Sequence, residues 1–203
     1  MKILGFHFTD RPTVDAHILA VKRRFRQKYW TLIHLKKYGF SEEELATVYK
    51  TIVRPVADYC SVVYHPMMTD AQDEEMDRCQ AHALRCIYGM GVSYAEMRRR
   101  AGVPTLRQRR IDQCDAFASK CLDNPKFRDW FPMKTGRTSG RSGEKYHEKF
   151  ARCNRLRNTP LYYVRRRLNG KERKDYGARN RDRRENSYRG GDSTVAWMEN
   201  QSN

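Results

Sequence analysis

Apolar residues are scarce in this chain, and they form no long run. Its 203 residues are 39% hydrophobic, and the share is the same when its twelve Gly are counted in place of its twelve Tyr. Average globular domains reach about 45–50%, so part of the chain is expected to lie outside any core. The longest apolar run has four residues, whereas a membrane-spanning helix needs about 20. No transmembrane segment is therefore expected, and the first residues lack the apolar stretch of a secretory signal.

The signatures of metal binding and of nucleophilic catalysis are also missing. The sequence has no Cys-x-x-Cys, no Gly-x-Ser-x-Gly and no glycine-rich phosphate loop. Cys79, His82 and Cys86 are residue types that bind zinc, and Cys60 and His65 could complete a set. Cys79 and Cys86, however, share one helical stripe, where Cys packs as a small hydrophobe. We expect no catalytic residue, no metal site and no cofactor here. The six Cys are expected to be reduced thiols in an intracellular compartment, the nucleus or the cytoplasm.

Positive charge is abundant and unevenly distributed. The chain has 41 Lys and Arg against 24 Asp and Glu, which predicts a polyanionic partner, nucleic acid first and an anionic membrane surface second. Residues 134–203 hold 19 of these cations against 8 carboxylates and are rich in Gly, Ser and Asn. Such a composition does not offset the entropy lost on ordering. We therefore expect a basic, largely disordered tail over 134–203, with one short helix near 160–169.

Extended structure is expected only at the start of the chain. Lys2–Phe8 is rich in β-branched and aromatic residues, and the turn signal Thr9–Pro12 follows it. Nothing else in the sequence is convincingly extended. Residues 1–12 are therefore predicted to hold one orphan β-strand with an exposed edge, followed by a turn.

Residues 13–133 carry the pattern of a helical domain. Apolar residues recur every three or four positions through 14–35, 45–56, 76–87 and 106–121. Pro55 must end or kink the helix that contains it. Helix starts are marked by Ser41, Ser93 and Thr105, and helix ends by Gly39, Gly89 and Gly102. The predicted fold class is mainly α, a small antiparallel helix bundle whose core is expected to include Val53, Tyr59, Leu84 and Ile87.

Three basic clusters stand out in the helical part. The first, Lys22–Lys28, adjoins Tyr29 and Trp30, and the others lie at 98–100 and 107–110. Each could be a solvated helix face or a set of contacts to backbone phosphates. Lys22 and Arg26 are an i,i+4 pair next to the apolar stripe, so both are expected to face solvent.

Several strings of the sequence, taken in order, resemble one family. Lys2–Phe6, with Asp10 and His17-Ile18 after it, is similar to a "K-x-L-G … D … H-I" segment, and residues 49–60 are similar to a "Y-x-x-x-V-R-P-x-x-E-Y" helix. Residues 77–89 resemble "E-x-x-Q-x-x-A-L-R-x-I-x-G", and residues 102–110 resemble "G-L-P-P-L-x-x-R-R". Residues 158–169 resemble an "N-S-P-L-x-Y … R-x-L-N" ending. These strings occur in this order in reverse transcriptases of non-LTR (LINE-type) retrotransposons.

The resemblance implies a non-catalytic part of an RNA-directed DNA polymerase. In the family these segments form the end of the palm, the thumb and a downstream extension, and the aspartates that hold Mg lie upstream of the first segment. The chain is thus expected to be a nucleic-acid-binding fragment without the catalytic carboxylates. The first strand would belong to a primer-contacting hairpin whose other half precedes the chain. Leu4 and Gly5 would then lie near the primer end, although ordinary strand packing explains Leu4 equally well.

Candidate contacts and partners follow from the basic clusters and the resemblance together. We expect RNA or DNA to be bound with weak sequence selectivity, and a separate palm-containing polymerase is a candidate partner. A second hypothesis is a stand-alone basic helical protein that binds RNA, DNA or an anionic membrane and has no relation to polymerases. The nucleic-acid-binding candidates are Lys22, Arg23, Arg26, Lys28, Arg107, Arg110, Arg166 and Arg167.

Overall fold

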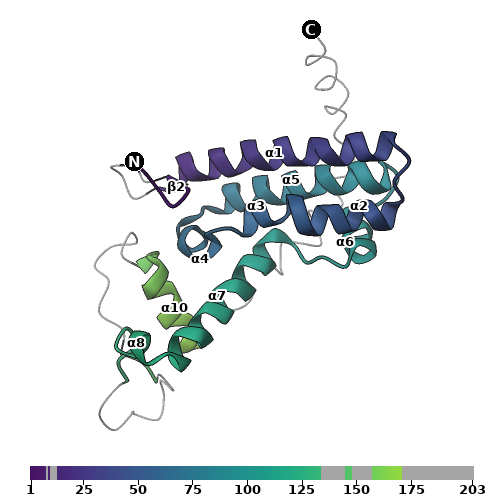
Figure 1. Cartoon of the computed structure of the whole chain (residues 1–203). Helices are drawn as coiled ribbons and strands as arrows, with labels where there is room; N and C mark the ends of the chain where they lie inside the picture. Colours follow the sequence, from purple (N-terminus) through teal and green to yellow (C-terminus); the bar gives the residue numbers. More distant parts are fainter. Residues whose placement is uncertain (8, 10–12, 134–144, 148–156, 171–203) are drawn as a thin grey trace.

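The computed structural model describes residues 1–7, 9, 13–133, 145–147 and 157–170. Within these ranges the chain is mainly helical and has one small two-stranded antiparallel sheet (Figure 1). The predicted mainly α fold class is confirmed. The predicted disordered tail beyond Asn169 lies outside the described residues.

The first seven residues form a β-hairpin instead of the predicted orphan strand. β1 (Lys2–Ile3) pairs antiparallel with β2 (Phe6–His7), with Ile3 opposite Phe6. Leu4 and Gly5 between the strands have φ angles of 46° and 82°, the left-handed backbone that a two-residue hairpin turn requires. The prediction was wrong because the partner strand lies within the same segment. Leu rarely adopts a positive φ, so the turn had only Gly5 as its signal.

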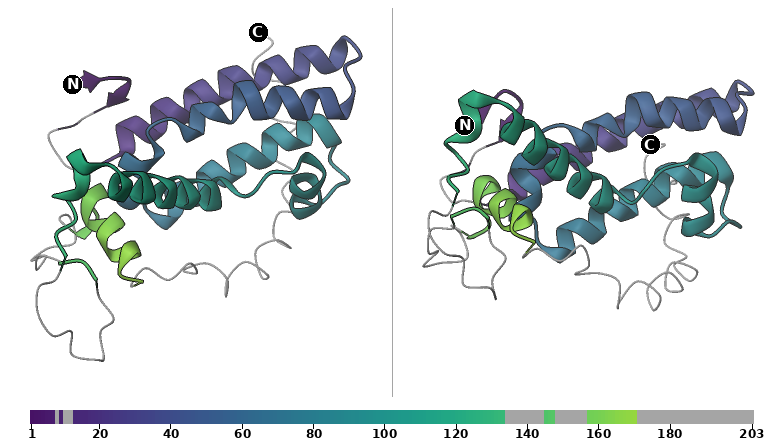
Figure 2. Two further views of the ribbon diagram at one scale, coloured as in Figure 1. Left: turned by 60° about the horizontal axis from the view of Figure 1, so that its bottom comes forward. Right: turned by 90° about the horizontal axis from the view of Figure 1, so that it is seen from below.

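Three long elements run side by side and enclose the main core. They are α1 (Asp15–Lys37), the helix that starts as α2 (Glu42–Val48), and α5 (Asp70–Tyr88), and the views in Figures 1 and 2 agree on this arrangement. Local sequence signals mark their ends. Ser41 and Thr69 both form capping boxes, with Glu44 and Gln72 respectively, and Gly39 follows α1 with a φ of 86°. The core between them includes Ile18, Phe25, Leu32, Leu45, Met76, Leu84 and Ile87.

The helix that contains Pro55 is interrupted, as expected. α2 continues into a π-helical turn, η1 (Tyr49–Val53), before α3 (Pro55–Asp58). Arg54 N–H donates to the Tyr49 carbonyl at 2.9 Å, an i−5 bond that widens the turn ahead of the proline. Buried residues therefore recur every fourth position, at Leu45, Tyr49, Val53 and Ala57.

Three of the four predicted core residues are buried, and one is not. Val53, Leu84 and Ile87 have no exposed surface, whereas Tyr59 is 52% exposed. α3 ends at Asp58, and Tyr59 has an extended backbone, with φ of −64° and ψ of 129°. The helix stops one residue before Tyr59, which is why this side chain leaves the core.

The remaining helices complete one side of the bundle. α4 (Ser61–Tyr64) and η2 (His65–Met67) lead into α5, and α6 (Tyr94–Ala101) follows it. α7 (Leu106–Asp123) crosses the bundle obliquely and ends near α8 (Pro125–Arg128), as Figure 1 shows. The predicted helix start at Ser93 is confirmed, but only half of a capping box forms there. Ser93 accepts from Glu96 N–H, while the Glu96 carboxylate pairs with Arg99 and Arg100.

The helix expected near 160–169 is present and packs against α7. α10 (Pro160–Leu168) places Val164 in a second core with Ala118, Cys121 and Phe131. The amide oxygen of Asn169, just after α10, accepts from the backbone N–H groups of Lys145 and Tyr146. The described residues after Met133 thus belong to the folded unit, which therefore extends beyond the predicted helical domain 13–133.

Candidate nucleic-acid interface

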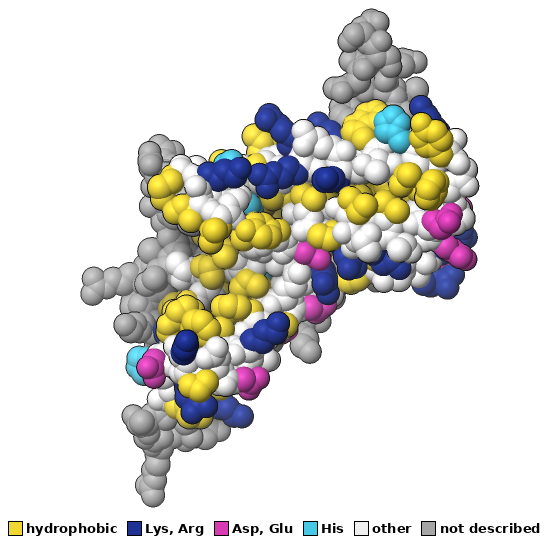
Figure 3. Space-filling model, in the orientation of Figure 1, with side chains coloured by type: hydrophobic (Ala, Val, Ile, Leu, Met, Phe, Trp, Pro, Cys, Tyr) yellow, Lys and Arg dark blue, Asp and Glu magenta, His cyan; other side chains and the backbone are white. Residues whose placement is uncertain are grey.

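The basic cluster of α1 is spread around the helix. Lys22 Nζ donates to Glu75 Oε2 on α5 at 2.7 Å, so its charge is neutralised within the chain. Arg26 lies one turn later on the same flank, whereas Lys28, six positions from Lys22, lies on the other flank. Arg23, Arg26 and Lys28 are exposed, and Figure 3 shows a row of Lys and Arg side chains over the amino-terminal half of α1. Lys22 is thus tied to α5, and Arg23, Arg26 and Lys28 stay predicted contacts.

α5 contributes a second set of cations beside Arg26. Arg78 and His82 are exposed, and Arg85 is half-buried one turn further on. Partial burial lowers the pKa of His82, and the positive charges of Arg85, Arg26 and Arg78 lower it further. Cations from two helices that pack together, Arg26 of α1 and Arg78 and Arg85 of α5, are thus near enough to His82 to lower its pKa. We call Arg26, Arg78, His82 and Arg85 the α1–α5 basic surface.

Sequence reasoning missed the α5 part of this surface. It assigned His82 to a possible metal set with Cys79 and Cys86, and it did not consider Arg78 and Arg85 as contacts. The signal was the spacing of 78, 82 and 85, which places these residues on one helical face. Among the described residues, no group of three or more His, Cys, Asp or Glu side chains is placed to hold a metal ion.

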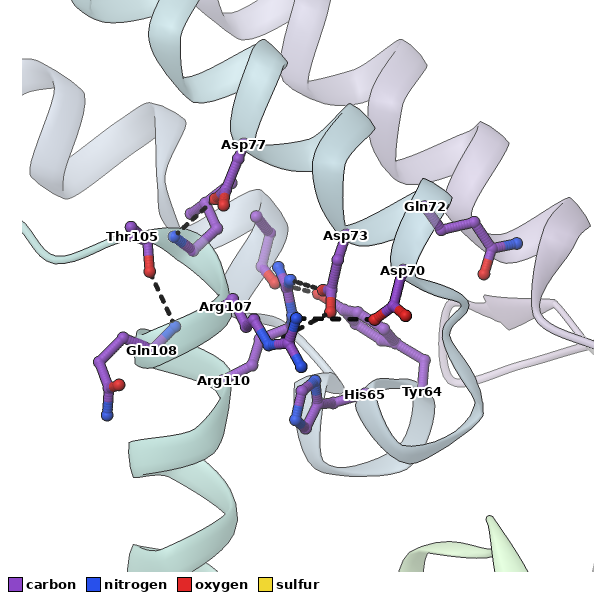
Figure 4. Close-up of polar contacts among 12 residues, drawn as sticks. Tyr64, His65, Asp70, Gln72, Asp73, Asp77, Thr105, Arg107, Gln108 and Arg110 are labelled. Atoms are coloured by element: carbon purple, nitrogen blue, oxygen red, sulfur yellow. Dashed lines mark hydrogen bonds and ion pairs between the residues drawn. The ribbon is translucent and has the colours of Figure 1, made fainter. Parts of the chain in front are cut away.

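Two other predicted contacts, Arg107 and Arg110, are engaged inside the fold. Arg110 is 1% exposed and donates to Asp73 on α5. Arg107 Nε lies 3.7 Å from Asp73 Oδ2, and its Nη1 lies 3.6 Å from Asp70 Oδ1 (Figure 4). The prediction that Arg110 contacts phosphate is wrong, because a buried guanidinium needs a carboxylate and here finds one at the start of α5. Arg107 lies near Asp73 as well, and also near Asp70.

The surroundings of Arg110 are themselves buried and polar. Figure 4 shows Tyr64 and His65 beside it, from α4 and η2. Burial lowers the pKa of His65 to about 3, with further contributions from the charges of Arg110, Arg107 and Arg167. His65 Nε2 lies 3.2 Å from the hydroxyl of Tyr163 on α10. This cluster joins α5, α7 and α10, so we assign it to the stability of the fold.

Arg167 on α10 is likewise engaged within the chain, and its neighbour Arg166 is half-buried. The guanidinium of Arg167 donates twice to the Asp115 carboxylate of α7, and its side chain is 7% exposed. Such a two-point pair fixes orientation as well as charge. In the fold Arg167 holds α10 on α7, and its contact with nucleic acid stays a prediction.

Leu4 and Gly5, the predicted primer-end residues, form the tip of the hairpin. The hydroxyl of Tyr59 donates to the Leu4 carbonyl at 2.6 Å, and the Leu4 side chain is 84% exposed. A Cβ on Gly5 would lie 3.3 Å from the Tyr59 ring. The hairpin tip is thus held against Tyr59, while the role of Leu4 and Gly5 at a primer end stays a prediction.

Several polar residues of the sequence segments that carry the resemblance contact one another. Asp77 Oδ1 and Gln80 Oε1 both accept from Leu106 N–H, each at 3.1 Å. Arg109 Nε donates to Asp58 Oδ2 at 3.3 Å. The strings at 49–60, 77–89 and 102–110 are therefore joined in space through contacts that set the start of α7.

Comparison with known proteins assigns no family: no family model, no curated protein and no solved structure matches the chain. Among the described helices, none combines the length and the apolar composition needed to cross a membrane.

Proposed function

We propose that this chain binds the sugar–phosphate backbone of RNA or DNA, with weak sequence selectivity, through the α1–α5 basic surface. The observation that carries the proposal is that the exposed Arg26 and Arg78 lie on α1 and α5, which pack side by side, with Arg85 on the same face of α5 as Arg78. Like charges gathered on one surface repel one another, and a polyanion that bridges them relieves that repulsion. Guanidinium groups suit this task because their planar donors match phosphate oxygens.

The resemblance to LINE-type reverse transcriptases supplies a context for such binding. We propose that the chain acts as the thumb and downstream part of such a polymerase and holds nucleic acid. Nucleotidyl transfer would then belong to palm carboxylates that hold Mg, in a palm-containing polymerase. What this chain contributes is backbone binding, which does not depend on base identity.

The test is a salt series with the full chain and fluorescein-labelled RNA and DNA hairpins, followed by fluorescence anisotropy. Each neutralised phosphate contributes about −0.9 to the log–log salt slope on duplex DNA. The double variant Arg26→Gln/Arg78→Gln is expected to weaken binding to all sequences and to flatten the slope by about one to two units. The matched control is Lys126→Gln/Arg128→Gln, which removes two exposed charges from α8. We expect it to change the slope by less than half as much.

Two outcomes would overturn the proposal. Equal losses in the two double variants would show that net charge alone drives binding. Tighter binding to phosphatidylserine vesicles than to either hairpin, with the same loss in Arg26→Gln/Arg78→Gln, would assign the surface to an anionic membrane.

A further inference from the structure

Trp30 is a large aromatic side chain left partly uncovered on α1. It is 37% exposed, and its ring lies nearly parallel to that of Tyr29, with centroids 6.0 Å apart and planes at 12°. Tyr29 is half-buried and packs against the main core. The indole is therefore backed by a ring that the core holds in place, while more than a third of Trp30 faces solvent.

The indole lies next to the α1–α5 basic surface. Arg26 precedes Trp30 by one helical turn, so the two side chains share a face of α1. Tyr29, to which the indole is stacked, has a raised pKa because of its burial and because Cys86 and Cys79 lie close to it. His82 lies between these two cysteines on α5, and α1 packs against α5, which places Tyr29 at the level of His82 and Trp30 next to it along α1.

We infer that Trp30 and the α1–α5 basic surface form one binding site for single-stranded nucleic acid, in which an unpaired base stacks on the indole while Arg26, Arg78 and Arg85 contact the flanking phosphates. The inference rests on the proposed function and narrows its ligand. In a duplex the base faces are covered by neighbouring bases, so an exposed aromatic ring finds no base face on which to stack. A single strand offers both a charged backbone and uncovered bases, the combination that aromatic residues in basic grooves bind.

The test uses the full chain with labelled oligouridylate, an abasic strand of equal length, and a hairpin duplex. Trp30→Ala is expected to weaken oligouridylate binding about tenfold, with the salt slope and the affinity for the duplex and for the abasic strand unchanged. Trp30→Phe keeps a ring and should retain most of the affinity. The control is Tyr38→Ala, because Tyr38 is 81% exposed at the end of α1, two turns beyond Trp30, and should leave binding unchanged.

The arms of the experiment separate this inference from the proposed function. Equal affinity of wild type and Trp30→Ala for oligouridylate, or an equal loss on duplex and single strand, overturns the stacking site. If the slope still flattens in Arg26→Gln/Arg78→Gln, backbone binding stands without it. Should Trp30→Ala fail to fold, wild type must still bind oligouridylate more tightly than the abasic strand, and equal binding of the two strands overturns the inference.

Discussion

α5 separates two groups of arginines. On the side next to α1 lie Arg26, Arg78 and Arg85, whose charges add to partial burial in lowering the pKa of His82. On the side next to α7, Arg110 and Arg107 meet Asp73. Runs of basic residues in the sequence led to both α1 and α7, and the structure pairs Arg107 and Arg110 of α7 with Asp73, and Lys22 of α1 with Glu75. The carboxylates that a basic run meets in the fold, more than the length of the run, set how its cations are used.

The largest effect is expected from removing the buried arginine. Arg110→Met leaves the mostly buried Asp73 without its closest cation and should lower the free energy of unfolding by about 3–5 kcal/mol. Urea denaturation followed by circular dichroism measures the change. Folded Arg110→Met should keep the salt slope of nucleic-acid binding.

Its control is Arg99→Gln, because Arg99 pairs with Glu96 on the surface and its side chain is 75% exposed. Arg99→Gln should lower the free energy of unfolding far less than Arg110→Met does. If Arg110→Met is unfolded, Asp73→Asn/Arg110→Met also removes the isolated carboxylate charge and should recover part of the stability. Equal losses in Arg110→Met and Arg99→Gln would contradict a structural role for the buried pair.

Like the arginines, the histidines include exposed and buried members: His82 is exposed and His17 is buried. The second-largest effect on stability is expected from His17. His17 is 2% exposed and stacks on Phe6 at 4.2 Å, and neither ring nitrogen has a hydrogen-bond partner among the described residues. Burial, with the charges of His7 and Arg24, lowers its pKa from 6.5 to about 4. Between these values the unfolded chain binds the proton and the folded chain does not, so stability falls as pH falls.

His17→Phe keeps the stacked ring and removes this titration. Its stability relative to wild type should rise by up to about 1.4 kcal/mol per pH unit as pH falls from 6.5 towards 4. Urea denaturation of both proteins at several pH values measures the difference, in which the other titrating groups cancel. A difference that does not vary with pH would show that His17 is protonated in the folded state.

The sequence predicted what nearby residues decide. Gly39, Ser41 and Thr105 end or cap helices through contacts within a few positions, and helix positions followed from them. The hairpin escaped prediction because Leu4 adopts a φ of 46°, which its residue type disfavours and the contact with Tyr59 supports.

The candidate interface was predicted only in part because it depends on distant residues. Arg110 and its partner Asp73 are 37 positions apart, and a basic run does not show which carboxylate will reach it. The α5 side of the basic surface becomes visible once α1 and α5 are known to lie side by side. Arg26 was found from its own helix, whereas Arg78 and Arg85 required the pairing of two helices.

The smallest effect on stability is expected from Lys36, an exposed cation that contacts the backbone of another helix. Lys36 Nζ donates to the carbonyls of Cys86 and Ile87 at 2.9 and 2.8 Å, where α5 is about to end. A cation at this end of a helix favours the macrodipole, so Lys36→Gln should lower the free energy of unfolding by about 0.3–1 kcal/mol. Lys37→Gln removes the same charge from an exposed neighbour that shares the last turn of α1 but not the contacts with α5, and it should lower stability less. Added salt should shrink the difference between the two variants. Equal stabilities of the two variants at low salt would show that the contacts of Lys36 with α5 do not stabilise the fold.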